Sequence, residues 1–387
     1  MNNGTEERID TLVVGGGQAG LAVGYHLSRA GIPFLIVDAN QRTGDPWRHR
    51  WDSLRLFTPN RFNSLPGLQI PGEDWGFPSK DDVADYLESY AAHFELPIRH
   101  GTRVDRLSSE TGGFLATAGN TEFHARRVVV AMASYQKAKV PEFGSGLESG
   151  IVQLHAAEYK GPSQLSDGDV LVVGLGNSGA EIAMDLAPHY RVHLSGEPSA
   201  VQPFRPERLS GRILMPFVGP VILNGLLTTS NPLGRKVRSK MLDKAAPLLR
   251  VKPKDLVAAG VERVGRVTGV ADGFPVLDDG SILEVGNVVW CTGFEPGYSW
   301  IDLPVFDNRG RVLHQRGVVS SEPGMYFVGL KFQYSVLSDT LLAADRDAGY
   351  VVDHLAGLRS SPSGSGIRSE SLDPGDRIPD PESDSVL

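Results

Sequence analysis

A glycine-rich turn near the start of the chain constrains the fold more than any other stretch. Residues 11–14 form an apolar run, and Gly15, Gly17 and Gly20 follow it with the spacing G-x-G-x-x-G. In a strand–turn–helix unit the first glycine makes the tight turn, the second lets a pyrophosphate approach the backbone, and the third lets helix and strand pack closely. The N–H groups at the helix start also attract phosphate. The stretch therefore predicts a dinucleotide-binding unit with contacts from Gly15, Gly17, Gln18, Ala19 and Gly20.

A second apolar run and an acidic residue complete this unit. Residues 32–37 predict the next strand, and Asp38 follows it, 18 residues after Gly20. A carboxylate at this position accepts hydrogen bonds from the hydroxyl groups of a ribose. A glycine-rich turn alone also occurs in other α/β proteins, but the order of strand, turn, helix, strand and acid favours a bound dinucleotide.

The segment after this strand is rich in aromatic and basic residues. Two tryptophans and three arginines fall within residues 44–56. Loops that follow strands in such folds carry many ligand contacts. We therefore expect Trp47 and Trp51 to lie against a flat aromatic ligand and Arg55 to lie near its polar edge. The alternative is an amphipathic surface loop.

The opening pattern recurs in the middle of the chain. Residues 169–173 predict a strand, 181–186 continue a helix, and 192–194 predict the following strand. The same glycine spacing joins the first two of these elements. Two matches in the same structural context predict a second dinucleotide site, with contacts from Gly174, Gly176, Asn177, Ser178 and Gly179.

The choice of nicotinamide coenzyme depends on the end of the strand after this second turn. Aligning the strand ends selects Ser195, whereas counting 18 residues from Gly179 selects Glu197. A hydroxyl with nearby cations, for which Arg205 and Arg208 are candidates, suits a 2′-phosphate, and a carboxylate suits a 2′-hydroxyl. We predict that Ser195 contacts the coenzyme, that Glu197 faces solvent and that NADPH is preferred, with NADH as the alternative.

Strands on both sides of the second turn indicate how the chain divides. Residues 103–125 predict a β-meander, 127–131 predict a strand returning to the first sheet, and strands resume after residue 286. We predict an α/β protein with two Rossmann-like dinucleotide-binding domains, of which the second is inserted into a discontinuous first. The predicted boundaries are 9–165 with 286–358 for the first domain, 166–285 for the second, and 359–387 for a polar, disordered tail whose removal leaves stability unchanged.

Composition excludes several other classes of function. The chain of 387 residues has a net charge of −8, which argues against nucleic-acid binding. Its one cysteine, Cys291, allows neither an internal disulfide nor a thiolate metal site. We expect no bound metal and a location in the reducing cytoplasm. Residues 1–8 lack the order of regions found in a signal peptide.

One apolar segment needs a separate interpretation. Residues 213–227 are strongly apolar but contain two prolines and two glycines. The segment is therefore too short and too interrupted to predict a transmembrane helix. We predict a buried hairpin or helix pair, and the alternative is a substrate lid or a segment that rests on a membrane.

The sequence resembles the class B flavin-dependent monooxygenases, which include flavin-containing, Baeyer–Villiger and indole-3-pyruvate monooxygenases. The resemblance covers residues 9–358. His155 with Tyr159 matches the second half of the family's identifying motif, although the leading Phe and Gly of that motif are absent. The resemblance implies FAD at the first glycine turn and Asp38, and NADPH at the second turn. It is strongest to the indole-3-pyruvate branch, at residues 51–56, 77–80, 86–90 and 170–183.

The resemblance also implies a reaction. FAD is reduced by NADPH and then adds O2, and the resulting C4a-(hydro)peroxyflavin oxygenates a small organic substrate. Glu197 stands where many relatives carry an arginine for the 2′-phosphate, and no catalytic residue is assigned. Two alternatives remain open: a flavin reductase or oxidase without productive oxygenation, and a redox-sensing flavoprotein that regulates a partner such as a transport system. A homodimer is also left open.

Overall fold

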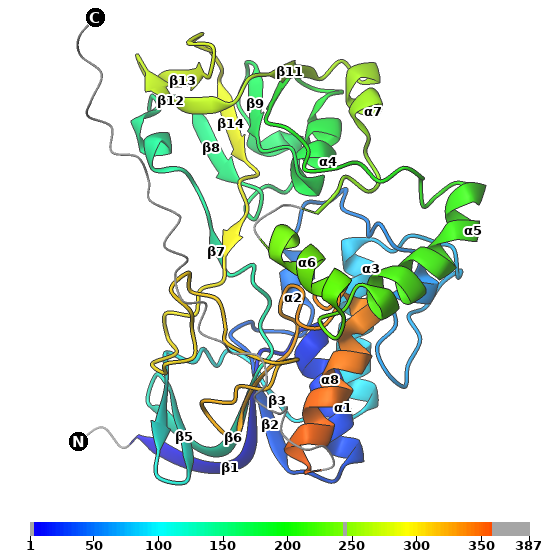
Figure 1. Ribbon diagram of the computed structural model, residues 1–387. Helices are drawn as coiled ribbons and strands as arrows, with labels where there is room; N and C mark the ends of the chain where they lie inside the picture. The colour runs from blue at the N-terminus through cyan, green and yellow to red at the C-terminus, as the bar shows by residue number, and fades with distance from the viewer. Residues whose placement is uncertain (1–3, 243–245, 358–387) are drawn as a thin grey trace, which may run out of the picture.

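The computed structural model describes residues 4–242 and 246–357, and its strands form two large sheets and two short ladders. One large sheet lies in the lower half of Figure 1 and the other in the upper half. The predicted tail, 359–387, lies outside the described residues.

The lower sheet has seven strands and contains the first glycine turn. Side chains of its central strand alternate between two cores: Val13 packs beneath the helices, and Leu12 and Val14 pack on the opposite face. Because both faces are covered, the strand is apolar along its length near the turn. The strands are, in spatial order, β3 (Ile98–Arg99), β2 (Phe34–Val37), β1 (Thr5–Val14), β6 (Thr121–Val130), β5 (Gly113–Ala118) and β4 (Arg106–Glu110), with β16 (Met325–Phe327) also beside β6.

Strand β6 joins two elements that the sequence predicted separately. Its first half pairs antiparallel with β5, its second half pairs parallel with β16, and its whole length runs parallel to β1. The end of the predicted meander and the strand predicted over 127–131 are therefore one continuous strand. The rest of the meander is confirmed, since β4 and β5 form the expected antiparallel pair.

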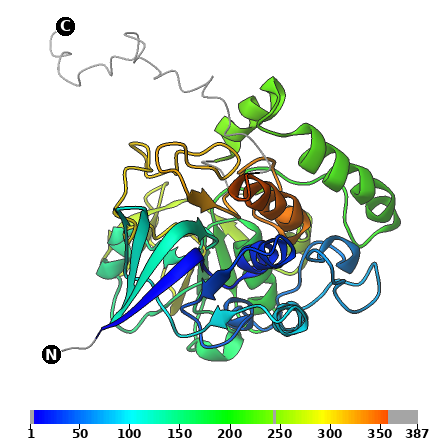
Figure 2. The same ribbon diagram turned by 90° about the horizontal axis from the view of Figure 1, so that it is seen from below.

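Three helices cover one face of the lower sheet. The helices α1 (Gln18–Arg29) and α8 (Leu341–Leu355) lie side by side, as Figures 1 and 2 show. The third, α3 (Lys80–His93), begins with a capping box: the Ser79 hydroxyl accepts from the Asp82 N–H at 3.2 Å. The Asp82 carboxylate accepts in return from the Ser79 N–H at 2.8 Å. Such caps stabilise a helix start by about 1 kcal/mol.

The upper sheet has five parallel strands and contains the second glycine turn. The predicted boundaries at 165 and 286 assign β8 and β14 to the first domain, but both strands pair within the upper sheet. An apolar run signals that a strand is buried and does not specify its partner, so the pattern could not assign these strands to a sheet. The spatial order is β11 (Glu262–Val264), β10 (Val192–Ser195), β9 (Val170–Val173), β14 (Asn287–Trp290) and β8 (Val152–His155).

A short antiparallel ladder lies where the chain passes between the two sheets. Strand β7 (Lys137–Ala138) follows β6, strand β15 (Phe294–Glu295) follows β14, and the two pair with each other. Figure 1 shows this ladder between the upper and lower strands. Further elements are α4 (Asn177–Leu186), α7 (Pro253–Ala258), η1 (Asn60–Phe62), η2 (Glu142–Gly146), η3 (Pro162–Gln164), β12 (Val267–Ala271) and β13 (Phe274–Leu277).

The apolar segment is helical but exposed, so the prediction that it is buried is wrong. Helix α5 (Leu209–Phe217) continues directly into the π-helix η4 (Val218–Leu226), and α6 (Pro232–Met241) follows. For example, Ile213 is 61% exposed and Phe217 is 65% exposed. The joined helix is also long and apolar enough for a membrane span by length and composition, with mean hydropathy of 1.3 over 18 residues. The helix continues through Pro216 in α5 and Pro220 in η4, although a proline has no N–H to donate.

Candidate functional site

The first glycine turn is closed to side chains at its two ends and open in the middle. Gly15 has a φ of +109°, and a Cβ atom on Gly20 would lie 1.8 Å from the Gly15 carbonyl oxygen. Neither position therefore accepts a side chain. A Cβ atom on Gly17, the N-cap of α1, would meet nothing within 4 Å. This open cradle against the first N–H groups of α1 fits the phosphate groups of a dinucleotide.

The carboxylate of Asp38 is fixed beside this turn. Its Oδ2 accepts from the Gly16 N–H at 2.5 Å, and its Oδ1 accepts from the backbone and side-chain N–H groups of Asn40, both at 2.7 Å. A carboxylate has about four acceptor positions. The three bonds orient Asp38 and leave it able to accept from a ribose hydroxyl.

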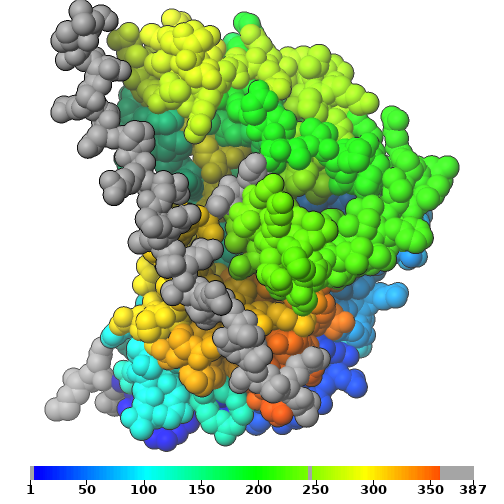
Figure 3. All heavy atoms as spheres, viewed as in Figure 1, coloured from blue at the N-terminus to red at the C-terminus, as the bar shows by residue number. Residues whose placement is uncertain are grey.

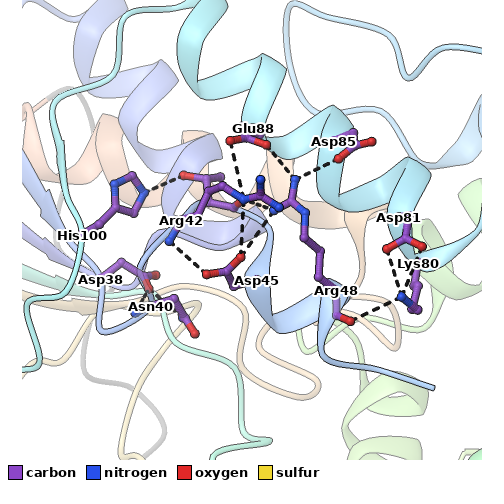
Figure 4. Close-up of polar contacts among 11 residues, drawn as sticks. Asp38, Asn40, Arg42, Asp45, Arg48, Lys80, Asp81, Asp85, Glu88 and His100 are labelled. Atoms are coloured by element: carbon purple, nitrogen blue, oxygen red, sulfur yellow. Dashed lines mark hydrogen bonds and ion pairs between the residues drawn. The ribbon is translucent and has the colours of Figure 1, made fainter. Parts of the chain in front are cut away.

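A network of ion pairs holds the loop that follows β2. This loop contains the short helix α2 (Asp45–Arg48), and the Arg48 guanidinium reaches from it to α3 (Figure 4). Arg48 donates to Asp85 at 2.9 Å, to Glu88 at 2.7 Å and to the Thr43 carbonyl at 2.7 Å. The Arg48 side chain is 14% exposed, whereas its partners Asp85 and Glu88 are 73% and 43% exposed. The loop therefore leaves α2 in a fixed direction.

The aromatic and basic residues of this loop divide between two roles. Trp47 packs, partly buried, against the core beneath α1 and α3, and Trp51 is buried in the core of the upper sheet. Arg55 is exposed and donates to the Phe77 carbonyl at 3.2 Å, beside the start of α3. Both tryptophans pack against hydrophobic cores, and the contacts predicted for Trp47, Trp51 and Arg55 with a flat aromatic ligand stay predictions.

Five side chains meet where the two sheets join, and we call them the central cluster: Arg50, Tyr135, His155, Phe294 and Asp339. The Phe294 ring lies in the middle, with the ring centroids of Tyr135 and His155 at 5.6 and 4.9 Å. The Arg50 guanidinium carbon lies 5.7 Å from the same ring. The Tyr135 hydroxyl donates to an Asp339 carboxylate oxygen at 3.3 Å. The cluster residues thus come from five parts of the chain: the loop after β2, the segment between β6 and β7, β8, β15 and the loop before α8.

Contacts connect the central cluster to both glycine turns. From the first turn, Gln18 donates to the Asp339 carbonyl at 3.2 Å, while Ala19 beside it is buried in the core. The His155 Nε2 lies 3.0 Å from the carbonyl oxygen of Gly293, which stands two residues after Cys291, the residue whose backbone packs against the second turn. The resemblance pointed to His155 alone among these residues. No periodic or motif signal could have selected the rest of the cluster.

Burial sets the charges within the cluster. Removal from water lowers the pKa of Arg50 and of His155, so His155 is neutral at pH 7. Burial also raises the pKa of Asp339, and the facing Asp339 carboxylate raises the pKa of Tyr135. At neutral pH the cluster therefore holds the Arg50 cation, a neutral imidazole and a protonated phenol beside the Asp339 carboxyl group.

The second glycine turn repeats the geometry of the first. Gly174 has a φ of +109°, and a Cβ atom on Gly179 would lie 1.9 Å from the Gly174 carbonyl oxygen. A Cβ atom on Gly176, the N-cap of α4, would again meet nothing within 4 Å. Cys291 packs against this turn as Ala131 packs against the first. The residues present fit a second dinucleotide, as the spacing predicted.

The N-terminus of α4 also fixes a neighbouring loop. The Asn177 side chain donates to the Pro247 carbonyl at 2.9 Å and accepts from the Leu249 N–H at 2.9 Å. Ser178 follows it in the first turn of α4. Asn177 therefore joins the second turn to the chain that returns from α6.

The predicted coenzyme contact at Ser195 is not supported by its surroundings. Ser195 is 1% exposed, and its hydroxyl donates to the Gly265 carbonyl at 2.8 Å and accepts from the Val267 N–H at 3.2 Å. The single hydroxyl proton is already used, so Ser195 has none to donate to a phosphate. Its role is to fix the chain between β11 and β12.

The charges around the end of β10 differ from those predicted. The Glu197 side chain is 83% exposed, as predicted, and it pairs with Arg263 at 2.6 Å. Arg263 also donates to the Gly196 carbonyl at 2.9 Å. Arg205, predicted as a phosphate ligand, pairs instead with Asp255 at 2.6 Å. The cation at the strand end is Arg263, which the sequence reading missed because it comes from β11, 66 residues further along the chain.

Comparisons with known proteins agree with this geometry. A family model described as pyridine nucleotide-disulphide oxidoreductase matches residues 12–213. An uncharacterized CzcO-like oxidoreductase of Geobacillus kaustophilus is 41% identical over 350 residues, which are 90% of this chain and 98% of that protein. Indole-3-pyruvate monooxygenase YUCCA1 of Oryza sativa subsp. japonica is 28% identical over 78% of this chain and 82% of its own. A solved flavin-containing monooxygenase from Stenotrophomonas maltophilia has a TM-score of 0.74 and 26% identity, covering 91% of this chain and 99% of that one.

The protein belongs to the pyridine nucleotide-disulphide oxidoreductase family. Its relatives include flavin monooxygenases, which confirms the resemblance to the class B flavin-dependent monooxygenases. Membership of this family implies an oxidoreductase with a Rossmann-type α/β fold that uses flavin and nicotinamide cofactors.

This oxidoreductase does not use an internal dithiol, because Cys291 is its only cysteine. Burial raises the pKa of the Cys291 thiol to about 12, so the thiol is protonated at neutral pH. Among residues 4–242 and 246–357, no group of three or more His, Cys, Asp or Glu side chains could hold a metal ion. Redox chemistry in this family member is therefore expected from its cofactors.

The oxidoreductase should lose stability as pH rises, through a buried carboxyl group beside the second turn. The Glu181 side chain is 5% exposed and lies 3.1 Å from Arg250, yet burial outweighs this cation and raises its pKa from 4.5 to about 7. The folded state thus binds the proton more tightly. Its contribution to stability is complete below pH 4.5 and is lost as pH rises through 7. Glu181→Gln should stabilise the protein at pH 8 by about 2 kcal/mol and have little effect at pH 5.

Urea unfolding of both proteins between pH 5 and pH 8 tests this expectation. The exposed Glu148, changed to Gln, is the matched control and should show no pH-dependent difference. A Glu181→Gln protein that is destabilised more at pH 8 than at pH 5 would show that the Arg250 pair dominates instead.

Proposed function

We propose that this protein is an FAD- and NADPH-dependent monooxygenase that oxygenates a small organic substrate. One observation carries the proposal: two glycine turns of matching geometry, each open at a single glycine, are both connected to one cluster of polar and aromatic side chains. Two dinucleotides bound in this way would meet at the central cluster, as hydride transfer between them requires.

The two cofactors have separate proposed binding residues. Gly17 and the first N–H groups of α1 would hold the FAD pyrophosphate, and Asp38 would accept from its ribose. Gly176, Asn177 and Ser178 would hold NADPH in the same manner. FAD supplies hydride acceptance and activation of O2 when it is bound. We assign the lower sheet to FAD and the upper sheet, including β8 and β14, to NADPH.

The central cluster would control the surroundings of the reacting atoms. Arg50 supplies a fixed positive charge that burial leaves poorly hydrated. Bonds to Asp339 and to the Gly293 carbonyl hold the Tyr135 hydroxyl and the neutral His155 ring in place, and the half-buried Phe294 ring lies between them. Such preorganised groups act on developing negative charge more strongly than water does.

Selection of NADPH is proposed to depend on Arg263. Its guanidinium lies beside Gly196, just past the end of β10, where a 2′-phosphate ligand is expected. Glu197 competes for this cation through its 2.6 Å ion pair. Removing the Glu197 carboxylate should leave Arg263 available to pair with a 2′-phosphate. A second cation at position 197 should raise the affinity for that phosphate further.

Glu197→Arg is therefore expected to raise the preference for NADPH over NADH about tenfold, which corresponds to ~1.4 kcal/mol. Glu197→Gln should raise it by a smaller factor. The measurement is kcat/KM for flavin reduction with each coenzyme. Glu262→Gln, which removes an exposed carboxylate from neighbouring β11, is the control and should leave the ratio unchanged. A wild-type protein that strongly prefers NADH would overturn the assignment.

Stopped-flow oxidation of the reduced protein with NADP+ present tests the proposed reaction. A transient absorbance of a C4a-oxygenated flavin, followed by return of the oxidised spectrum, supports a monooxygenase. Direct return to oxidised flavin with release of one peroxide per NADPH indicates a flavin oxidase. Reoxidation too slow for turnover, together with binding of a protein partner in one redox state only, indicates a redox sensor.

A further inference from the structure

A row of large apolar side chains lies exposed along the joined helix α5–η4. We define the apolar ridge as Leu209, Ile213, Phe217, Val221 and Leu226, which are 73%, 61%, 65%, 50% and 58% exposed, respectively. The first four recur at every fourth position and so lie along one side of the helix. Figures 1 and 2 show this helix at the margin of the molecule, away from both sheets. A contiguous exposed apolar surface of this kind marks a binding surface.

The charge around the apolar ridge contrasts with that of the whole protein. Residues 208–242 contain six basic residues and no acidic residue, a net charge of +6. The chain as a whole carries −8, so the remaining residues carry −8 − 6 = −14. The same segment that exposes apolar side chains is therefore the basic part of an acidic protein. Its cations are Arg208, Arg212, Arg235, Lys236, Arg238 and Lys240.

Contacts near both ends fasten the joined helix to the rest of the protein. Ser335 donates to the Asn224 side chain at 2.9 Å, and Arg346 of α8 donates to the Asn224 carbonyl at 2.9 Å. Near the other end, the Arg212 guanidinium lies 5.8 Å from the Trp75 ring. For the helix to enter a bilayer core these polar contacts to α8 and to the loop before it would have to break, so we expect it to lie along a surface and not to cross it.

The positive charge of this segment favours an anionic membrane over a second copy of the chain as the partner of the apolar ridge. A second copy of this chain bound through the same face would bring two segments of +6 together. An anionic bilayer surface instead attracts lysine and arginine and accepts apolar side chains between its headgroups. We propose that the apolar ridge and the adjoining α6 form an interfacial element that binds this protein to anionic lipid membranes.

Vesicle sedimentation with the full-length holoprotein tests the proposal. At low salt the protein should bind phosphatidylglycerol-containing vesicles at least tenfold more tightly than pure phosphatidylcholine vesicles. Higher salt should weaken the binding, because it screens the basic segment. Lys236→Gln combined with Lys240→Gln should weaken it about 25-fold, since each cation near such a surface contributes about fivefold.

The double variant Ile213→Asp with Phe217→Asp tests the apolar ridge itself and should lose vesicle binding at least tenfold. Val257→Asp is the matched control, because Val257 is 67% exposed on α7 near the upper sheet and should leave binding unchanged. Flavin content and melting temperature confirm that each variant is folded. Absent binding to anionic vesicles, or binding that the Ile213/Phe217 variant retains, would overturn the proposal. A wild-type dimer in light scattering that this variant abolishes, without vesicle binding, would assign the ridge to a second copy.

Discussion

A Gly17→Val protein is expected to fold normally and to be purified without bound flavin. The φ and ψ of Gly17 are −82° and −169°, an extended conformation that valine adopts readily. Its Cβ would meet no protein atom within 4 Å. The valine methyl groups would instead occupy the space proposed for the pyrophosphate, and flavin affinity should fall by at least about 10³-fold, some 4 kcal/mol.

The flavin-to-protein absorbance ratio of the purified protein measures this loss, and thermal unfolding against flavin-stripped wild type measures the fold. Gly150→Val is the matched control, since an added Cβ there also meets nothing within 4 Å and should leave flavin content unchanged. Gly20→Ala should behave differently and fail to fold, because its Cβ would lie 1.8 Å from the Gly15 carbonyl oxygen. Full flavin occupancy in the Gly17→Val protein would remove the first turn from the FAD site.

A Gly176→Val protein should show the reciprocal result: full flavin content and almost no reduction by NADPH. Gly176 has extended φ and ψ of −94° and −171°, and its Cβ would also meet open space. The substitution should therefore leave the fold intact and block the second pyrophosphate. We expect kcat/KM for anaerobic flavin reduction by NADPH to fall at least about 100-fold, or ~2.7 kcal/mol.

Reduction by dithionite separates the coenzyme site from the flavin, because it requires no nicotinamide. The Gly176→Val protein should be reduced by dithionite at the wild-type rate. Unchanged reduction by NADPH would show that the coenzyme does not bind at the second turn. Loss of flavin from this variant would contradict the assignment of the two sheets to different cofactors.

The local features of the fold were predictable because each depends on neighbouring residues. The glycine turns need small residues at fixed spacing, and the Ser79–Asp82 cap needs two side chains three positions apart. The buried positions of α3 recur at helical spacing, since Val83, Tyr86 and Tyr90 are at most 2% exposed. None of these features requires knowledge of a distant segment.

Features that depend on distant segments were not predictable in the same way. Strand β14 follows the second unit but pairs within it, and its four buried residues would read alike in either sheet. Residues 213–227 were expected to be buried because they are apolar, yet composition does not reveal whether another element covers a helix. The cation near the end of β10 could not be predicted for the same reason, because Arg263 reaches it from a different strand.

The candidate site shows the same division. Asp38 lies at the end of its strand as its spacing predicts, because a strand end and the next turn are local. Among the arginines of residues 44–56, the sequence selected Arg55, whereas the one that contacts Phe294 is Arg50. Which arginine points between the sheets depends on how Arg48 anchors the loop to α3, and a motif does not encode that contact.

The packing of Cys291 against the second turn has a consequence for how long such an enzyme survives its own chemistry. Reduced flavin that meets O2 without substrate releases hydrogen peroxide, and peroxide attacks thiolates. With the pKa of this thiol at about 12, roughly one molecule in 10⁵ carries a thiolate at pH 7. The chain has no second cysteine. The one cysteine therefore offers almost no thiolate to this by-product, so uncoupled turnover should consume reducing equivalents without inactivating the protein through its thiol.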